Sequence, residues 1–392
     1  MNYLGRKVYL WWVVWAFWAV GCSDQEEEWK EYALTVSQQQ ILSHLPSDLI
    51  IAHRGTSYWA PEGSEAAMRW ARNAGASYLE FDLQKTRDGY LVVSHDQDLR
   101  QQTNVETVYP GRAAEPISSF TLEELLQLDT SGAFNRKHPR VARQRFEGQG
   151  LLTLEDVVRI AEGYRICRDA SSHRLYTIEG GKVVFQYEPD PYDNGNRPGI
   201  YPEVKNSESY GDMETRLKAE LTRLGWYAPS YAALKAIPVK SGCVGIANTP
   251  SRVVIQTLSL SSLEKLQQTF GHSTPFCFLI SSGTPVDQKE YTKWINAAVR
   301  YGAVIIGPSV ARGPENYQDL LTDWMYELIH EKGLKIHAYT FNEEAQVSDY
   351  MTRVDGYITD KTIEIRKYVL QLRKQPLVSA QSTSQLLDQL GY

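Results

Sequence analysis

Residues able to do chemistry gather at the ends of short apolar runs in the first quarter of the chain. His53 and Arg54 follow one such run, Glu80 and Asp82 end a second, and His95 follows a third. Carboxylates suit a hard cation, histidines transfer protons near neutral pH, and arginine binds phosphate oxygens. These residue types together predict metal-assisted chemistry on a phosphate.

Three carboxylates are the candidate metal ligands. Glu80 and Asp82 are two residues apart on an expected strand and therefore face the same side. Glu203 ends a later strand and is followed by Lys205. Ligation by oxygen alone predicts a divalent cation, Ca2+ before Mg2+. The alternatives are solvated acids, or a salt-bridged rim with Arg54 and Lys205.

The two histidines are the candidate general acid and base. His53 and His95 on opposite sides of a phosphorus atom would deprotonate the attacking oxygen and protonate the leaving one. The alternative for either is a histidine satisfied in the core. Arg54 and Lys205 are candidate phosphate ligands, or charge compensation for the acids. Asp96 either orients His95 or caps the strand end.

The elements that must position these residues alternate between strand and helix. The expected strands are 49–53, 78–83, 90–94, 199–205, 253–258, 275–280, 303–307, 334–341 and 355–359. This alternation implies a parallel sheet with helices outside. No Gly-x-Gly-x-x-Gly pattern follows the first strand, and the length favours a closed barrel. We therefore expect an α/β fold of the TIM-type (β/α)8 class, with its site at the carboxyl ends of the strands.

Two hairpins interrupt the alternation. A turn at Asp88-Gly89 favours a hairpin that brings His95 level with Asp82, so the barrel is expected to be distorted near its second and third strands. Residues 174–186 predict a second hairpin, within an insertion of about 165–198. The basic stretch 132–150 is expected to be an irregular loop.

Composition and the N-terminus limit the partners. The 392 residues carry a formal charge of −6 without a long basic run, which argues against nucleic acid as a partner. Residues 1–22 are typical of a bacterial lipoprotein signal, in which Cys22 is lipidated. The alternatives are an ordinary signal peptide or one anchor helix. We expect a membrane-anchored protein of the bacterial cell envelope, facing the periplasm or on the cell surface.

The remaining domain boundaries follow from the assignment of residues 1–22 as a signal. We expect a tether and lead-in helix over 23–47, one barrel domain over 48–374, and a tail over 375–392. The cysteines at 167, 243 and 277 permit one disulfide at most, or are three buried hydrophobic residues.

The charged motifs, taken in order, resemble those of the glycerophosphodiester phosphodiesterase family. The matching segments are His53-Arg54-Gly55, Glu80-Phe81-Asp82, His95-Asp96, Glu203-Val204-Lys205, Tyr339-Thr340-Phe341-Asn342 and Asp355-Gly356-Tyr357-Ile358-Thr359-Asp360. The resemblance covers about residues 49–367, and the chain is similar in particular to the periplasmic branch of the family.

The resemblance implies a TIM-type barrel that uses Ca2+ or Mg2+ to cleave glycerophosphodiesters to glycerol phosphate and an alcohol. The resemblance is compatible with direct attack by water on the phosphorus, and also with a first attack by a substrate hydroxyl that gives a cyclic phosphate. Carried over by position, Glu80, Asp82 and Glu203 hold the metal, and His53 and His95 are the acid/base pair. The carried-over phosphate ligands and supporting residues are Arg54, Lys205, Glu62, Asp96 and Tyr339.

The chain departs from the family pattern at three motifs, and its expected hairpin over 174–186 has no counterpart in that pattern. Gly63 replaces the asparagine of Pro-Glu-Asn-Thr, Tyr339 replaces a tryptophan, and Thr257-Leu258-Ser259 replaces Ser-Phe-Asp. The reaction is therefore better supported than the substrate. A related barrel phospholipase or lyase acting on intact phospholipids, and a surface lipoprotein that only binds a ligand, are the competing hypotheses.

Overall fold

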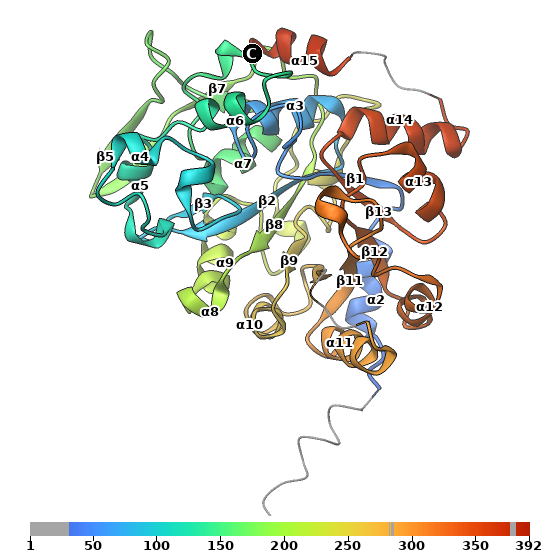
Figure 1. Ribbon diagram of the computed structural model, residues 1–392. Helices are drawn as coiled ribbons and strands as arrows, with labels where there is room; N and C mark the ends of the chain where they lie inside the picture. Colours follow the sequence, from blue (N-terminus) through green and yellow to red (C-terminus); the bar gives the residue numbers. More distant parts are fainter. Residues whose placement is uncertain (1–30, 282, 284–285, 377–381) are drawn as a thin grey trace, which may run out of the picture.

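Eight parallel strands close into a barrel in the computed structural model of the protein, which describes residues 31–281, 283, 286–376 and 382–392 (Figure 1). Each strand is hydrogen-bonded to its neighbours, and the last pairs with the first through Leu49 and Gly356. The barrel strands are β1 Leu49–Ala52, β2 Tyr78–Lys85, β8 Gly199–Val204, β9 Ile255–Thr257, β10 Phe276–Ile280, β11 Ala303–Pro308, β12 Lys335–Ala338 and β13 Gly356–Thr359. The predicted TIM-type barrel is confirmed.

Helices surround the barrel and connect successive strands (Figure 1). The α-helices are α2 Val36–Ser43, α3 Glu65–Ala74, α4 Val105–Val108, α5 Leu122–Leu125, α6 Ser131–Lys137, α7 Leu154–Ala161, α8 Ser207–Tyr210, α9 Met213–Arg223, α10 Leu260–Phe270, α11 Gln288–Arg300, α12 Asp323–Glu331, α13 Glu344–Tyr350, α14 Thr362–Leu372 and α15 Thr383–Leu390. The 3-10 turns are Leu99–Gln101, Ile117–Ser119, Gln144–Phe146, Tyr231–Ala233, Ile246–Asn248 and Pro314–Asn316.

Local sequence signals explain where α3 begins and ends. The Ser64 hydroxyl accepts a hydrogen bond from the Ala67 amide at the first turn, and Gly75 ends the helix with a φ of 84°. A left-handed residue of this kind is the usual end of a helix, and glycine adopts it without steric cost. The helix is thereby fixed directly after the loop that carries Arg54 and Glu62.

The barrel is distorted where the sequence predicts it. Strand β3 (Leu91–Val93) lies outside the closed ring and pairs antiparallel with β2, with Leu83 opposite Val93. The Ser94 amide donates to the Asp82 carbonyl at 3.0 Å, so the hairpin returns its end to the carboxyl end of β2.

The second predicted hairpin is also present. Strands β5 Tyr176–Glu179 and β6 Lys182–Phe185 pair antiparallel, beside a two-stranded sheet of β4 Tyr164–Ile166 and β7 Tyr187–Pro189. The three cysteines within the described part of the chain are free thiols, and of these Cys277 is buried.

The predicted loop over 132–150 is wrong at its start, because residues 131–137 form α6. The carboxylate of Asp129 accepts hydrogen bonds from the amides of Ser131 and Gly132, which satisfies the first turn, and Phe134 is buried. One buried aromatic residue gives no apolar periodicity, so the helix is invisible in the sequence pattern.

One end of the barrel is covered by α2. Its Ile41 and Leu42 pack on the apolar cluster inside the barrel, which includes Leu49 at the start of β1. Gln38 donates to the carbonyls of Val299, in the last turn of α11, and Ala303, at the start of β11. Helix α2 therefore lies at the amino ends of the strands, opposite the ends that carry the charged motifs.

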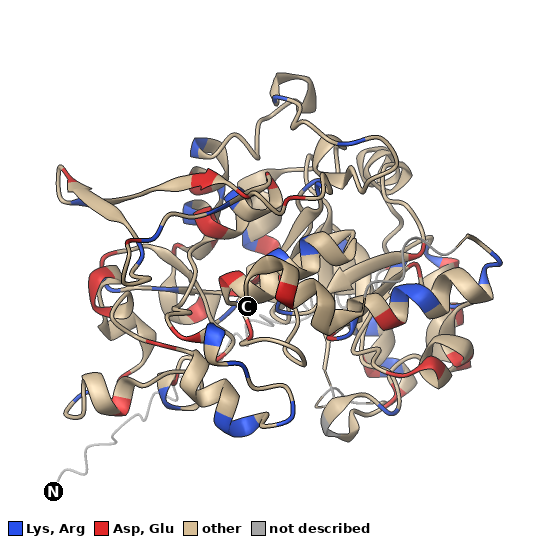
Figure 2. Ribbon diagram, turned by 90° about the horizontal axis from the view of Figure 1, so that it is seen from above, with Lys and Arg blue, Asp and Glu red and all other residues tan. Residues whose placement is uncertain are grey.

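Acidic and basic residues are interspersed along the ribbon in Figure 2. Within the described ranges, no helix is long and apolar enough to span a bilayer. The signal-peptide and lipidation predictions concern residues 1–22, which lie outside the described residues.

Candidate active site

The three predicted metal ligands come together at the carboxyl ends of β2 and β8. Asp82 and Glu203 are register partners on these adjacent strands, and Glu80 faces the same side two residues before Asp82. One oxygen of each carboxylate lies within 4.8 Å of the others. All three side chains are buried.

Burial and mutual repulsion make it unfavourable for all three carboxylates to be ionised together without additional positive charge. Burial, together with Asp82, raises the pKa of Glu80 to about 7. Burial also raises the pKa of Glu203 to about 8, against the opposing effect of Lys205. Burial would raise the pKa of Asp82 as well, but Lys205 and Arg54 outweigh it and hold that pKa below its usual range. An oxygen-only donor set of this charge fits a hard divalent cation.

The two candidate phosphate ligands contact these acids. Arg54 donates through Nη1 to Glu62 at 2.9 Å, and its Nε lies 3.4 Å from Oδ2 of Asp82. Its backbone amide donates to Oε2 of Glu80 at 2.7 Å. Lys205 Nζ lies 3.1 Å from Oε1 of Glu203 and 3.6 Å from Oδ1 of Asp82. Both cations therefore compensate the acids in this structure, and both stand beside the predicted cation site.

His53 is held by a carboxylate that the sequence analysis does not single out. Its Nδ1 lies 2.8 Å from Oδ1 of Asp360, which follows β13. The Ser57 hydroxyl donates to the same oxygen at 2.6 Å, and the Asn342 amide donates to the other at 2.7 Å. Burial lowers the pKa of His53, but Asp360 outweighs it, so that the pKa is raised overall.

His95 has a more open environment. Its Nδ1 lies 2.7 Å from Oδ1 of Asp96, and about a third of its side chain (34%) is exposed. The pKa of His95 is lowered, chiefly by burial, while Asp82 acts in the opposite direction. Asp96 therefore contacts His95, as the predicted role of orienting this histidine requires.

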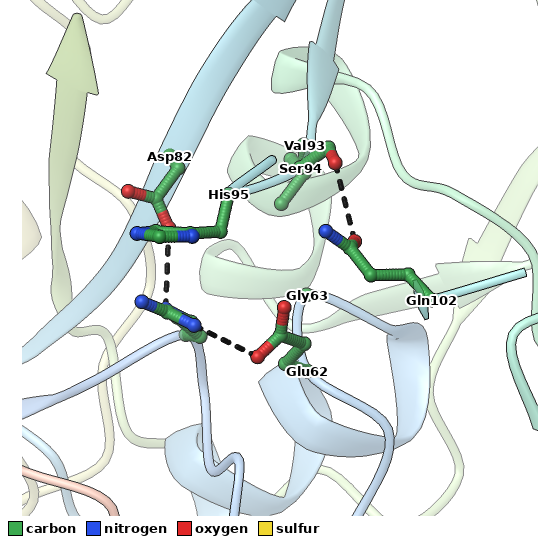
Figure 3. Close-up of a pocket in the computed structure, with 8 residues that line it drawn as sticks. Glu62, Gly63, Asp82, Val93, Ser94, His95 and Gln102 are labelled. Carbon is green, nitrogen blue, oxygen red and sulfur yellow. Dashed lines mark hydrogen bonds and ion pairs between the residues drawn. The ribbon is translucent and has the colours of Figure 1, made fainter. Parts of the chain in front are cut away.

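A small pocket lies on the His95 side of the site, between Arg54, Asp82 and His95 (Figure 3). It is lined by polar side chains together with Gly63 and Val93. The polar lining residues are Arg54, Glu62, Asp82, Ser94, His95 and Gln102. In Figure 3, Asp82, His95 and Glu62 point toward the same space from three different segments.

The two remaining predicted supporting residues, Glu62 and Tyr339, lie near the acidic cluster without belonging to it. Glu62 lies outside the acidic cluster and is the ion-pair partner of Arg54. Tyr339 follows β12, and its hydroxyl donates to the Ile280 carbonyl at 3.0 Å. Burial and the charge of Glu203 raise the pKa of Tyr339, which places the phenol within electrostatic reach of the cluster.

Several residues of the site were missed in the sequence. Asp360 and Asn342 belong to segments that match the family pattern, yet neither reads locally as a histidine partner. Gln256 on β9 donates from Nε2 to Oε1 of Glu80 at 2.7 Å. A polar residue inside an apolar strand was the available signal for Gln256, since such residues are seldom buried without a partner.

A closed parallel barrel that carries a buried carboxylate cluster, two histidines and two cations at its carboxyl end is the arrangement of a barrel phosphodiesterase, with a cluster that could hold a metal ion. The sequence profile of the glycerophosphoryl diester phosphodiesterase family matches residues 53–171 and 238–364. The chain belongs to this family and is a phosphoric diester hydrolase. The match omits 172–237, where Glu203 and Lys205 lie, so the place of these two residues in the site is established by β-sheet register.

Similar proteins carry the family name. The chain is 26% identical over 299 residues to a glycerophosphodiester phosphodiesterase of Bacillus subtilis (strain 168), covering 76% of this chain and 78% of the relative. It is 38% identical over 112 residues to a glycerophosphodiester phosphodiesterase of Caldanaerobacter subterraneus subsp. tengcongensis, covering 29% of this chain and 40% of the relative.

Solved structures share the fold. An Oleispira antarctica phosphodiesterase in complex with the product sn-glycerol-3-phosphate matches with a TM-score of 0.54 at 16% identity, covering 84% of this chain and 98% of that one. A glycerophosphodiester phosphodiesterase from Agrobacterium tumefaciens str. C58 matches with a TM-score of 0.51 at 19% identity, covering 82% and 99%. At these identities the likeness concerns the barrel alone.

Proposed function

We propose that the protein hydrolyses glycerophosphodiesters to glycerol phosphate and an alcohol, with a divalent cation held by Glu80, Asp82 and Glu203. The observation that carries the proposal is the convergence of these buried acids with two histidines of opposite pKa displacement at one barrel end. We propose Ca2+ as the cation, because carboxylate-rich sites of flexible geometry suit it.

The two histidines take different roles in this proposal. His95 has a lowered pKa and is neutral near pH 7, so it is the general base that removes the proton from the attacking oxygen. His53 has a raised pKa and a carboxylate partner, so it holds the proton that it donates to the leaving alkoxide. One P–O bond forms as another breaks, and the proton taken by His95 balances the one given by His53.

The cations position the phosphate. A bound divalent cation would polarise a phosphoryl oxygen and stabilise the charge that develops on it. Arg54 and Lys205 then exchange part of their contact with the acids for the remaining phosphate oxygens. Arg54 keeps its position because its backbone amide and its guanidinium are each bonded to a carboxylate.

The pocket favours a deacylated diester over an intact phospholipid. Val93 is the one large apolar residue among those that line it. Acyl chains require a continuous apolar surface, whereas glycerol and phosphate require hydrogen-bonding groups of the kind present around His95 and Arg54. We therefore propose water-soluble glycerophosphodiesters as the substrate class.

We further propose that Cys22 is lipidated and anchors the enzyme in the bacterial cell envelope, on the sequence evidence alone. A Cys22→Ser variant is then expected to leave the membrane fraction while keeping its activity. Retention of this variant in washed membranes would overturn the anchor.

Release of glycerol phosphate from glycerophosphocholine tests the reaction. The wild type is expected to release it with added Ca2+ and to stop when a chelator is present, while His53→Ala loses at least a hundredfold in kcat. Full activity in His53→Ala, or activity indifferent to chelator and calcium, would remove the proposal.

A further inference from the structure

Gln256 carries an unused oxygen beside the acidic cluster. Its side chain is buried at 2% exposure on β9. Nε2 donates to Oε1 of Glu80 at 2.7 Å, so the amide nitrogen faces the acid. The carbonyl oxygen at the other end of the same amide has no hydrogen-bond partner among the residues that the structure describes. A buried polar atom without a partner is costly unless a ligand uses it.

Sheet register places the Gln256 side chain on the same side as the metal ligands. Asp82 pairs with Glu203, and Glu203 pairs with Gln256, so β2, β8 and β9 carry these three residues at the same height. Register partners in a parallel sheet point to the same side of it. The next residue, Thr257, points to the other side, and its hydroxyl lies 3.5 Å from the Val204 carbonyl.

We propose that the side-chain oxygen of Gln256 is a fourth protein ligand of the divalent cation, beside Glu80, Asp82 and Glu203. The inference rests on the cation of the proposed function. An amide oxygen adds a donor without adding negative charge to three buried acids that already repel one another, and calcium accepts amide carbonyls in its coordination shell of six to eight oxygens. The amide nitrogen at the same time holds Glu80 in place.

Three variants separate a ligand from a residue that only orients Glu80. Gln256→Met keeps the volume and removes both polar atoms, while Gln256→Glu keeps an oxygen and removes the amide hydrogens. Thr257→Val, on the opposite side of the same strand, is the matched control. Calcium affinity is measured by titration calorimetry. The number of coordinated waters is measured from the luminescence lifetime of bound Tb3+ in H2O and D2O, which needs no turnover.

Gln256→Met is expected to weaken calcium binding by roughly tenfold or more and to add one water to bound Tb3+. Gln256→Glu is expected to keep the wild-type water count, and Thr257→Val to match the wild type in both measurements. Weaker binding with an unchanged water count in Gln256→Met would mean that the residue only orients Glu80, and would overturn the ligand assignment. Unchanged binding and water count would overturn it as well.

Two further measurements keep these results interpretable. Circular dichroism melting in chelator shows whether Gln256→Met is folded, and if it is not, Gln256→Asn, which withdraws the amide by one methylene, is expected to add the same water. Glu203→Gln tests the proposed function separately. If the wild type and Glu203→Gln bind calcium equally, the cation site itself fails, whereas a loss in Glu203→Gln without an added water in Gln256→Met or Gln256→Asn overturns the present inference alone.

Discussion

Nδ1 of His53 lies 2.8 Å from Oδ1 of Asp360, a carboxylate 307 residues later in the chain. The two residues follow β1 and β13, which pair as the first and last strands of the closed barrel. Asp360 is itself fixed by donors from Ser57 and Asn342. Barrel closure therefore supplies the partner that fixes the orientation and proton affinity of His53.

Asp360→Asn is expected to lower the pKa of His53, because the carboxylate is what raises it against the effect of burial. A hydrogen bond to a charged group is worth about 1.5–3 kcal/mol, which corresponds to a shift of about one to two pH units. His53 must be protonated to act as an acid, so the descending limb of kcat against pH moves to lower pH by that amount. NMR titration of the His53 ring and the pH–rate profile measure it.

Ser57→Ala is the control for this shift, since it removes one donor to Asp360 and leaves the carboxylate in contact with His53. Its descending limb is expected to move by less than half as much. A profile for Asp360→Asn that falls uniformly at every pH, with the His53 titration unmoved, would contradict the assignment of Asp360 as its electrostatic partner.

The sequence was sufficient where a residue's role depends on its own strand. Glu80, Asp82 and Glu203 each end an apolar run, and the alternation of helices with these runs implies that the runs share one barrel end. It was insufficient where a role depends on which strands become neighbours. Gln256 acquires a role because β9 adjoins β8, and Asp360 because β13 adjoins β1. No local pattern carries that information.

Calcium is expected to stabilise the fold, and to do so more strongly as the pH rises. Without a cation, the pKa values of Glu80 and Glu203 in the folded protein are raised from the ordinary glutamate value of 4.5 to about 7 and about 8. Between these pH values the folded protein therefore holds protons that the unfolded chain has released. The folded state binds more protons across this window, so the free energy of unfolding falls as pH rises through it. A cation that binds the ionised acids reverses this loss.

The melting temperature with calcium and with chelator, at about pH 5.5 and about pH 8.5, checks this expectation. The difference is expected to be larger at the higher pH and to be nearly lost in Glu203→Gln. Glu208→Gln, at an exposed acid within α8, is the control and should behave as the wild type. Equal melting temperatures with and without calcium at the higher pH would contradict the prediction.

Asp190→Asn is expected to destabilise the protein by about 3–5 kcal/mol, because it removes the carboxylate that is hydrogen-bonded to two buried guanidinium groups. Asp190 accepts from Arg69 at 2.7 and 2.8 Å and from Arg72 at 2.6 Å, and all three side chains are buried. Urea unfolding followed by circular dichroism measures the change. Glu115→Gln breaks a partly exposed pair with Arg112 and should cost about 1 kcal/mol or less; an equal loss in both variants would refute the argument.

Gly63 stands where the family pattern has asparagine, and the structure gives a steric reason for it. A Cβ at this position would lie 2.8 Å from Cγ1 of Val93, and the backbone has a φ of 62°. Asparagine tolerates a positive φ better than most residues, so the obstacle to it is the contact with Val93. Both residues line the pocket beside His95, so this glycine and valine act as a pair that sets the pocket's shape.

Gly63→Asn alone is therefore expected to cost about 1–3 kcal/mol of stability through overpacking, and to lower kcat/KM for glycerophosphocholine. Val93→Ala removes the clashing methyl group, so the double variant should recover much of both losses, with a coupling of about 0.5–3 kcal/mol in a double-mutant cycle. Gly181→Asn is the matched control, because Gly181 has a similar φ of 77° with no atom within 4 Å of the added Cβ. If Gly63→Asn costs no more than Gly181→Asn, or if Val93→Ala does not rescue it, backbone conformation and not Val93 is the reason for the glycine.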